Sequence, residues 1–198
     1  MSGVAERLSR AIAAFQAENS RDPNLITDAG GVRPRELLDA ERLAAWVQRL
    51  EPQASEALVL ASHCQHLRRW ELPRSEFEPG RIGYLTWRKA LARFHADQAA
   101  RVLLGLGYEE TLVLAVRQIN LKQGMQSNPD VQSMEDALCL SFLEHELAEF
   151  ATKHPDEKLL DIIRKTWGKM SDRARQLALL LPLPERAQQL VKQALEPG

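Results

Sequence analysis

Apolar residues recur with the period of an α-helix along almost the entire chain. The pattern begins with "VAERLSRAIAAFQAE" near the start and recurs in every later segment between the Pro- and Gly-rich breaks. An apolar face that repeats every three to four residues is typical of amphipathic helices, whereas a half-buried strand alternates residue by residue. No segment alternates in this way, so the sequence predicts an all-α fold.

The breaks between these segments predict about eight helices in a single-domain helical bundle. Proline favours the first turn of a helix, so Pro34 and Pro52 are expected to open helices that end at about 50 and 70. The stretches at about 19–34 and 72–83 are rich in loop-forming residues. The remaining helices are expected at about 85–106, 109–122 and 131–152, then from Pro155, with short helices around "PLP". We expect an N-terminal helix and loop in 1–33, the core in 34–152 and C-terminal helices in 153–198.

Composition excludes several classes of protein. Of the 198 residues, 44% are hydrophobic and 27% charged, which is ordinary for a globular protein. The uncharged runs are too short to span a bilayer, and the first residues lack a signal-peptide pattern. The two cysteines, Cys64 and Cys139, form no CxxC motif and suit a reducing compartment. We therefore expect a cytoplasmic protein with no membrane partner.

Charge is distributed unevenly although the net charge is −1. Between residues 66 and 101 there are eight basic and four acidic residues, and between 102 and 161 there are four basic and eleven acidic. A basic centre in a near-neutral chain indicates a local anion site and argues against nucleic acid as the partner. The alternative is that the acidic segment neutralises these arginines.

Four polar side chains fall on helix faces that are otherwise apolar. His66, His95, Asp39 and Asp136 each align with apolar residues at helical spacing. A buried carboxylate without a partner is costly, so such residues need a cation, a hydrogen-bond cluster or a metal. Two imidazoles and two carboxylates suit Zn, Mn or Fe. Singly, each is as easily a structural hydrogen-bonding residue, and spacing does not show whether they converge.

Four strings resemble one family over nearly the whole chain. They are "QHLRRWELPR", "GYLTWRKALARFHA", "MEDALCLSFLE" and "KHPDEKLLDIIRKTWGKMS", in this order along the chain. Together they identify the chain as a member of the family called domain of unknown function 4202. This resemblance implies no known reaction.

A more distant resemblance is to the HD metal-dependent phosphohydrolase superfamily. "LASHCQHLRRWELP" is similar, without a gap, to the second-helix signature of that superfamily, whose His-Asp pair falls on Gln65 and His66. "DAERL" resembles the pattern headed by its first metal histidine, which places Asp39 at that ligand position. The resemblance implies an HD-like helical bundle. It also implies a divalent metal (Mn, Zn, Fe or Mg) held by Asp39, His66, His95 and Asp136. Only His95 and Asp136 keep the superfamily's residue types, which puts its usual metal cluster in doubt.

Basic and amide side chains around the signature predict the ligand-binding groups. Guanidinium groups bind phosphate in a bidentate manner, and lysine supplies a point charge. The predicted ligand-binding residues are Gln65, Arg68, Arg69, Arg74, Arg81, Arg88 and Lys122. His66 is the predicted catalytic residue, acting as a metal ligand or as a general acid and base.

Three hypotheses follow for the function. The first is a metal-dependent phosphohydrolase, or a binder of a small phosphorylated or nucleotide-like ligand, in which a metal activates water and arginines stabilise charge. The second is a metal-free pseudo-enzyme that acts as a binding or adaptor module. The third is an iron-dependent HD-type oxidase.

Overall fold

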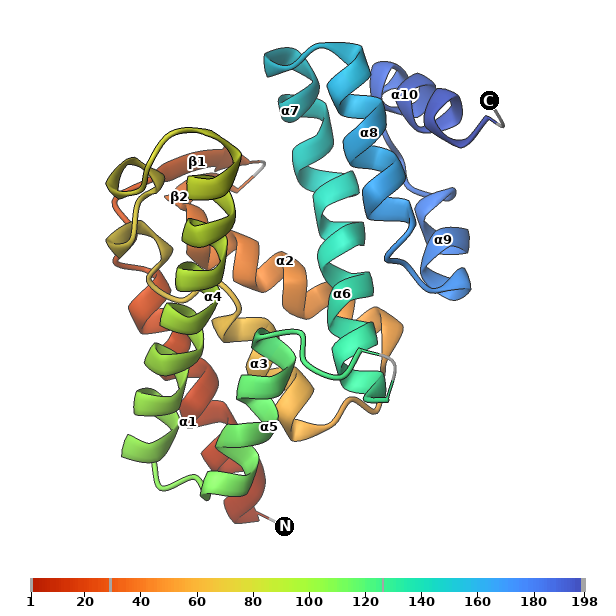
Figure 1. Cartoon of the computed structure of the whole chain (residues 1–198). Coiled ribbons are helices and arrows are strands. Elements are labelled where there is room, and N and C mark those ends of the chain that lie inside the picture. The colour runs from red at the N-terminus through yellow and green to blue at the C-terminus, as the bar shows by residue number, and fades with distance from the viewer. Residues whose placement is uncertain (1, 29, 126, 197–198) are drawn as a thin grey trace. The chain divides into compact units, whose positions relative to one another are not determined.

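The protein is helical except for one short hairpin, as a computed structural model shows for residues 2–28, 30–125 and 127–196 (Figure 1). The all-α prediction is confirmed. Ten α-helices occur in this described part of the chain, against about eight expected. One reason is that the helix predicted at 131–152 is two helices joined by a single π turn, η3 (Phe142–Glu146). The helices are α1 (Ser2–Asn19), α2 (Arg35–Leu50), α3 (Glu56–Cys64), α4 (Gly80–Gly105), α5 (Glu110–Asn120), α6 (Pro129–Ser141), α7 (Leu147–Lys153), α8 (Asp156–Trp167), α9 (Asp172–Ala178) and α10 (Glu185–Leu195).

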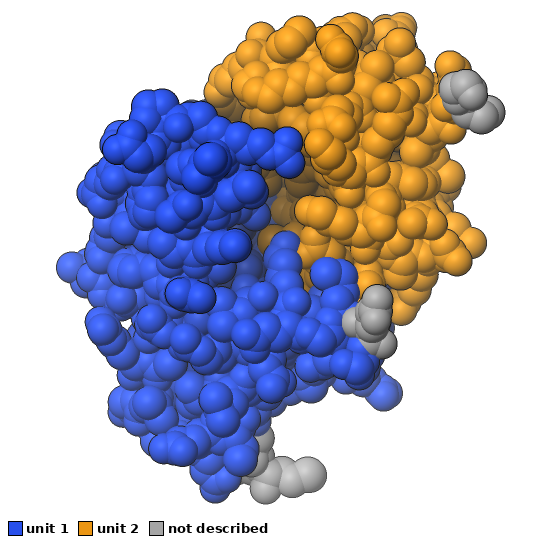
Figure 2. Space-filling model, in the orientation of Figure 1, with its two compact units in different colours: residues 1–131 blue, residues 132–198 orange. Residues whose placement is uncertain are grey.

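The chain divides into two compact units, residues 1–131 (unit 1) and 132–198 (unit 2) (Figure 2). Helices α1 to α5 and the hairpin lie in unit 1, and α7 to α10 lie in unit 2. In unit 2, α10 packs against α7 and α8. No helix within the described residues is both long enough and apolar enough to cross a membrane.

Helix α3 forms the centre of unit 1. It contacts α1, α2, α4 and α5, and six of its nine residues are buried. A helix that is apolar on all sides is stable only where other helices surround it. It begins later than expected because Ser55 caps it, its hydroxyl accepting a hydrogen bond from the Leu58 amide. It also ends earlier than expected, since Arg68 adopts a left-handed conformation (φ 57°) and a short 3-10 turn, η1 (Arg69–Glu71), follows.

The segment before α4 is folded tightly onto that helix. Arg74, in the 3-10 turn η2 (Arg74–Glu76), donates hydrogen bonds to the carbonyls of Phe77, Glu78 and Gly80. A Cβ at Gly83 would lie 1.8 Å from the Glu78 carbonyl oxygen, so only glycine fits there. As a result α4 begins at Gly80, ahead of the predicted start near Leu85.

The predicted loop at about 19–34 contains an antiparallel hairpin, β1 (Leu25–Asp28) and β2 (Gly31–Pro34), in which Leu25 pairs with Pro34. Leu25 and Val32 are largely exposed. Strands that bury no apolar face show no residue-by-residue alternation, and that is why the sequence pattern did not indicate them.

Candidate functional site

Four polar side chains meet in unit 1, and we call them the His66 cluster: Glu36, His66, Arg69 and His95. Glu36 lies in the first turn of α2, His66 and Arg69 in the turn after α3, and His95 in the middle of α4. His66 Nδ1 lies 3.8 Å from Glu36 Oε2, and Arg69 Nε lies 3.8 Å from Glu36 Oε1. The two imidazole rings are 5.9 Å apart and edge to face. The central helix α3 brings these elements together because α2 and α4 both pack against it.

His95 presents a lone pair in the interior of unit 1. Its side chain is 3% exposed and lies on the buried stripe with Leu91 and Ala99. Nδ1 lies 2.7 Å from the Leu67 carbonyl oxygen, which can only accept, so Nδ1 carries the hydrogen and Nε2 carries the lone pair. Nε2 is buried and has no hydrogen-bond partner among the described residues. Burial lowers the pKa of His95 to about 4, which keeps the ring neutral.

Glu36 is a buried carboxyl group that favours its protonated form. The side chain is 5% exposed, and its Oε2 has no hydrogen-bond partner in the described part of the chain. Burial raises the pKa of Glu36 to about 8, and the charges of Asp39 and Asp22 raise it further, while Arg69 and Arg35 act in the opposite direction. Asp22 also binds this residue's backbone, accepting a hydrogen bond from the Glu36 amide at 3.0 Å.

His66 is partly accessible to solvent. Its side chain keeps 34% of its surface accessible. Burial among protein atoms is the largest cause that lowers the pKa of His66, followed by the charge of Arg69. At neutral pH the ring is uncharged.

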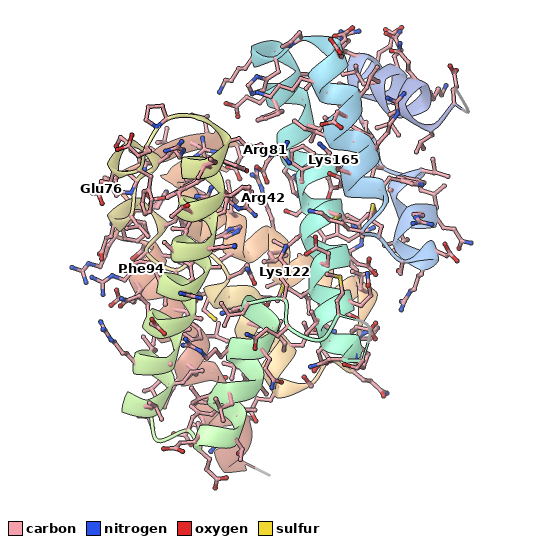
Figure 3. All side chains as sticks on the ribbon, in the orientation of Figure 1. Arg42, Glu76, Arg81, Phe94, Lys122 and Lys165 are labelled. Atoms are coloured by element: carbon pink, nitrogen blue, oxygen red, sulfur yellow. The ribbon has the colours of Figure 1, made fainter. Side chains whose placement is uncertain are left out.

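Three basic residues from separate segments act on the His66 ring through their charges. The charges of Arg69, Lys122 and Arg88 all lower the pKa of His66, so all three act on it electrostatically. Arg69 also lies over the Trp87 ring, with its guanidinium carbon 5.6 Å from the ring centroid. Lys122 lies just beyond α5 in a left-handed conformation (φ 55°), and Figure 3 labels it there. An anion at His66 would offset these positive charges.

The other predicted ligand-binding residues lie in different surroundings. Arg68 points away from this group and binds Glu71 and Gln98. Arg74 donates hydrogen bonds to the backbone carbonyls of Phe77, Glu78 and Gly80. Arg81 is exposed at the start of α4 (Figure 3). Gln65 is buried, and its Nε2 donates to the Asn120 carbonyl at 3.5 Å.

The two carboxylates predicted to bind metal have other partners. Asp39 pairs with Arg42 on the next turn of α2 at 3.3 Å. Asp136 lies in unit 2, where Oδ1 accepts hydrogen bonds from Gln132 Nε2 (2.9 Å) and the Ser171 amide (2.8 Å). Its Oδ2 accepts one from the Ser171 hydroxyl at 2.5 Å. As arranged in the described ranges, no three His, Cys, Asp or Glu side chains are positioned to hold a metal ion.

Sequence reasoning missed Glu36 and Asp22. Glu36 precedes Asp39 by three residues and Leu43 by seven, so it lies on the same apolar stripe and carried the same signal. Glu36 was not recognised because it lies in the first turn of α2, where acidic residues are common simply because they interact favourably with the helix dipole. Asp22 comes from a loop, and no periodicity could have indicated it.

Comparison with known proteins gives one match. The family model described as "Domain of unknown function (DUF4202)" matches residues 9–191. Neither the curated proteins nor the solved structures include a match.

Proposed function

Since the chain belongs to the domain of unknown function 4202 family, which names no reaction, we propose from the site alone that unit 1 binds a small phosphorylated ligand at His66. A phosphate monoester or a nucleotide is the ligand class that this chemistry fits. The related suggestion, a divergent HD-like phosphohydrolase, belongs to the same proposal.

The proposal rests on the positive charges of Arg69, Arg88 and Lys122, each of which lowers the pKa of His66. Arg88 is exposed, and its side chain makes no ion pair or hydrogen bond within the described residues. The nearest carboxyl group, Glu36, favours its protonated form and so contributes little negative charge at neutral pH. Arg88 thus contributes a positive charge that acts on His66 and that no carboxylate of the described residues pairs with, and such a charge favours a polyvalent anion.

Each group has a distinct part in this proposal. The guanidinium groups of Arg69 and Arg88 donate to phosphate oxygens, and Lys122 adds a point charge. His66 is neutral before the ligand arrives and gains a proton more easily beside an anion, so it can deliver that proton to a leaving oxygen. His95 Nε2 accepts a hydrogen bond from a ligand hydroxyl or from a protonated phosphate.

Calorimetric titration with inorganic phosphate, a phosphate monoester and a nucleotide monophosphate tests the proposal. We expect Arg88→Gln to weaken binding by about tenfold or more, because a charge-assisted hydrogen bond contributes about 1.5–3 kcal/mol. Lys89→Gln is the matched control, since Lys89 is the exposed neighbour of Arg88 on α4 and is not among the charges acting on His66. Arg81→Gln tests the more distant basic residue in the same way.

Equal affinity in Arg88→Gln and Lys89→Gln would contradict the proposal, and so would the absence of binding by all three probes. The adaptor hypothesis would then take its place. Arg69→Gln is a less decisive variant because Arg69 also contacts Glu36 and Trp87.

A second candidate, metal-assisted hydrolysis, is favoured by the geometry of His95. A histidine that donates one nitrogen to a backbone carbonyl and leaves the other free in the interior resembles a metal ligand. His95 Nε2, His66 Nδ1 and Glu36 Oε2 would form the donor set after small side-chain rotations, and a bound divalent metal would supply an activated water. The surrounding positive charge opposes a bare cation, so a metal would be expected to bind together with phosphate. Calorimetric titration of Mn²⁺ with and without phosphate tests this: tighter Mn²⁺ binding with phosphate present supports it, and equal affinity contradicts it.

A cytoplasmic location is part of the same proposal. Cys64 and Cys139 are buried and form no disulfide in the described structure, and burial raises the pKa of the Cys64 thiol to about 12. Cysteines outside disulfides suit a reducing compartment.

A further inference from the structure

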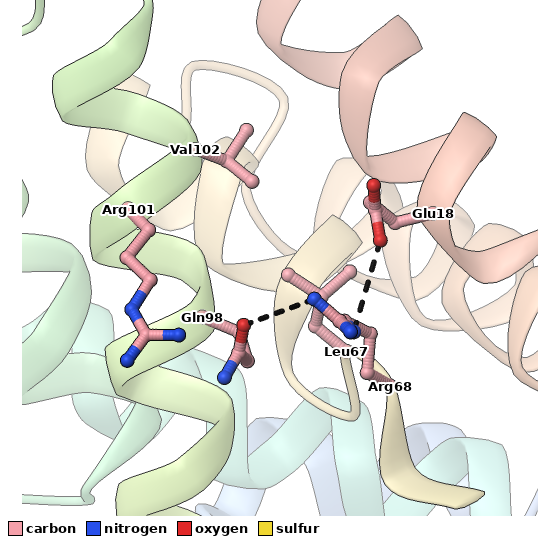
Figure 4. A pocket seen from close by; sticks show the side chains of 6 residues that line it. All are labelled: Glu18, Leu67, Arg68, Gln98, Arg101 and Val102. Atoms are coloured by element: carbon pink, nitrogen blue, oxygen red, sulfur yellow. Dashed lines mark hydrogen bonds and ion pairs between the residues drawn. The ribbon is translucent and has the colours of Figure 1, made fainter. Parts of the chain in front are cut away.

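A pocket in unit 1 lies beside the turn after α3 (Figure 4). It has a volume of about 220 Å³ and lies between α1, the turn after α3 and the second half of α4. We call it the Arg68 pocket, and its lining residues are Glu18, Leu67, Arg68, Gln98, Arg101 and Val102. Pockets for drug-sized ligands are larger, at about 300–1,000 Å³, so this pocket suits a small metabolite.

Arg68 organises the pocket. Its left-handed backbone is uncommon for a residue with a side chain and costs of order 1 kcal/mol. This conformation directs the guanidinium group toward Glu71 (2.7 Å) and Gln98 Oε1 (3.3 Å). Because Arg68 occupies the amide oxygen of Gln98, the amide nitrogen is the group left to donate to a ligand. Gln98 is only 8% exposed, so its position is well defined by packing.

Two opposite charges on the pocket lack a hydrogen-bonded partner. Glu18, from α1, has an Oε2 that is buried and accepts no hydrogen bond in the described part of the chain, and its carboxylate lies 3.7 Å from Arg21 and 3.8 Å from Arg68. Arg101, from α4, is exposed and forms no ion pair or hydrogen bond with the described residues. Figure 4 shows Glu18 and Arg101 on opposite sides, with Arg68 and Gln98 between them.

We propose that the Arg68 pocket binds a small zwitterion, a free α-amino acid with an aliphatic side chain. Its ammonium group donates to the Glu18 carboxylate, and its carboxylate accepts from Arg101 and the Gln98 amide. The side chain packs on Val102, a partly exposed apolar residue that lines the pocket. A simple anion would face the Glu18 carboxylate and a simple cation would face two arginines, so a ligand with both charges fits best.

NMR titration of the full-length protein with L-leucine tests this proposal. We expect shifts of the backbone amide signals of residues 67–68 and 98–102. N-acetyl-L-leucine, which lacks the ammonium group, and L-leucinamide, which lacks the carboxylate, should cause no shift at the same concentration. Arg101→Gln and Glu18→Gln should each weaken leucine binding by about tenfold or more.

Arg93→Gln is the matched control, because Arg93 is exposed on the same helix and does not line the pocket. It should bind leucine as the unaltered protein does, and the same spectra report whether each variant is folded. The proposal is wrong if leucine causes no shift at about 10 mM, a concentration above which binding would be very weak. It is also wrong if either blocked compound binds equally well, or if Arg101→Gln leaves the affinity unchanged.

Discussion

Glu36 in unit 1 and Asp136 in unit 2 are equally buried, each with 5% of its surface exposed, but their surroundings are opposite. Asp136 accepts three hydrogen bonds at 2.5–2.9 Å. Glu36 has cationic and imidazole neighbours no closer than 3.8 Å, and its Oε2 accepts no hydrogen bond from the described residues. Burial alone therefore does not determine how many hydrogen bonds a carboxylate accepts.

The difference lies in what each carboxylate does for its own unit. Asp136 binds Ser171, whose hydroxyl in turn caps α9 by accepting from the Ala174 amide at 3.2 Å. This carboxylate stabilises a helix start and leaves no oxygen for a ligand. Glu36 stabilises little and is kept protonated at a cost, a state typical of binding and catalytic sites.

The largest effect should come from Asp136→Ala. It removes three buried hydrogen bonds and loosens the cap of α9, so we expect a loss of about 3 kcal/mol in the free energy of unfolding. Urea denaturation followed by circular dichroism measures it. Asp172→Ala is the control in the same unit, since Asp172 is exposed and pairs only with Arg175 in the described structure, and it should cost under about 1 kcal/mol. A loss no larger than that of the control would show that Asp136 is not structural.

The replacement Glu36→Gln should raise the free energy of unfolding at alkaline pH, whereas Asp136→Ala lowers it. The folded-state pKa of Glu36 is raised to about 8 from an ordinary 4.5, so its contribution to stability is complete below pH 4.5 and is lost as the pH rises through 8. Relative to Glu36→Gln, the unaltered protein should lose about 1 kcal/mol between pH 7 and 8. Urea denaturation at both pH values checks this, and parallel pH dependence of the two proteins would contradict it.

The titration of His66 should respond to phosphate. Its pKa lies well below the ordinary value, and a bound anion offsets the positive charges of Arg69, Lys122 and Arg88, so phosphate should raise it. The imidazole carbon signals in NMR spectra report the titration directly. An unchanged His66 titration at saturating phosphate would place the anion elsewhere.

Much of the fold could be predicted from the sequence because helical periodicity is a local signal. The helices containing His95 and Asp136 were expected, although α4 begins at Gly80, ahead of the predicted start near Leu85, and α6 ends at Ser141, where the π turn begins. Their ends were harder to predict, because they depend on single contacts: the Ser55 cap of α3 and the left-handed Arg68 that ends it. The hairpin buries no apolar face and so produced no pattern.

The candidate site was harder to predict than the fold. Periodicity correctly indicated that His95 and Asp136 are buried, but it carries no information on which hydrogen-bond partners a buried group finds. Asp136 finds Ser171, 35 residues further along the chain. The effect of the Arg88 and Lys122 charges on His66 likewise depends on tertiary packing and not on spacing.

The smallest effect on stability should come from Asp39→Asn. This variant replaces a carboxylate that is more exposed than those of Glu36 and Asp136. Asp39 pairs with Arg42, an interaction typically worth about 0.3–0.5 kcal/mol on a helix surface. It also repels Glu36 and thereby raises the pKa of that group. The two effects oppose each other, so the free energy of unfolding at pH 7 should change by less than about 0.5 kcal/mol. The pKa of Glu36, measured from its carboxyl carbon signal, should nevertheless fall, and the Arg42→Gln variant, which leaves Asp39 charged, should not lower it. If Asp39→Asn instead abolishes phosphate or Mn²⁺ binding, Asp39 takes part in the binding site, as the resemblance to HD phosphohydrolases implies. The site would then include carboxylates from two successive turns of α2, Glu36 and Asp39.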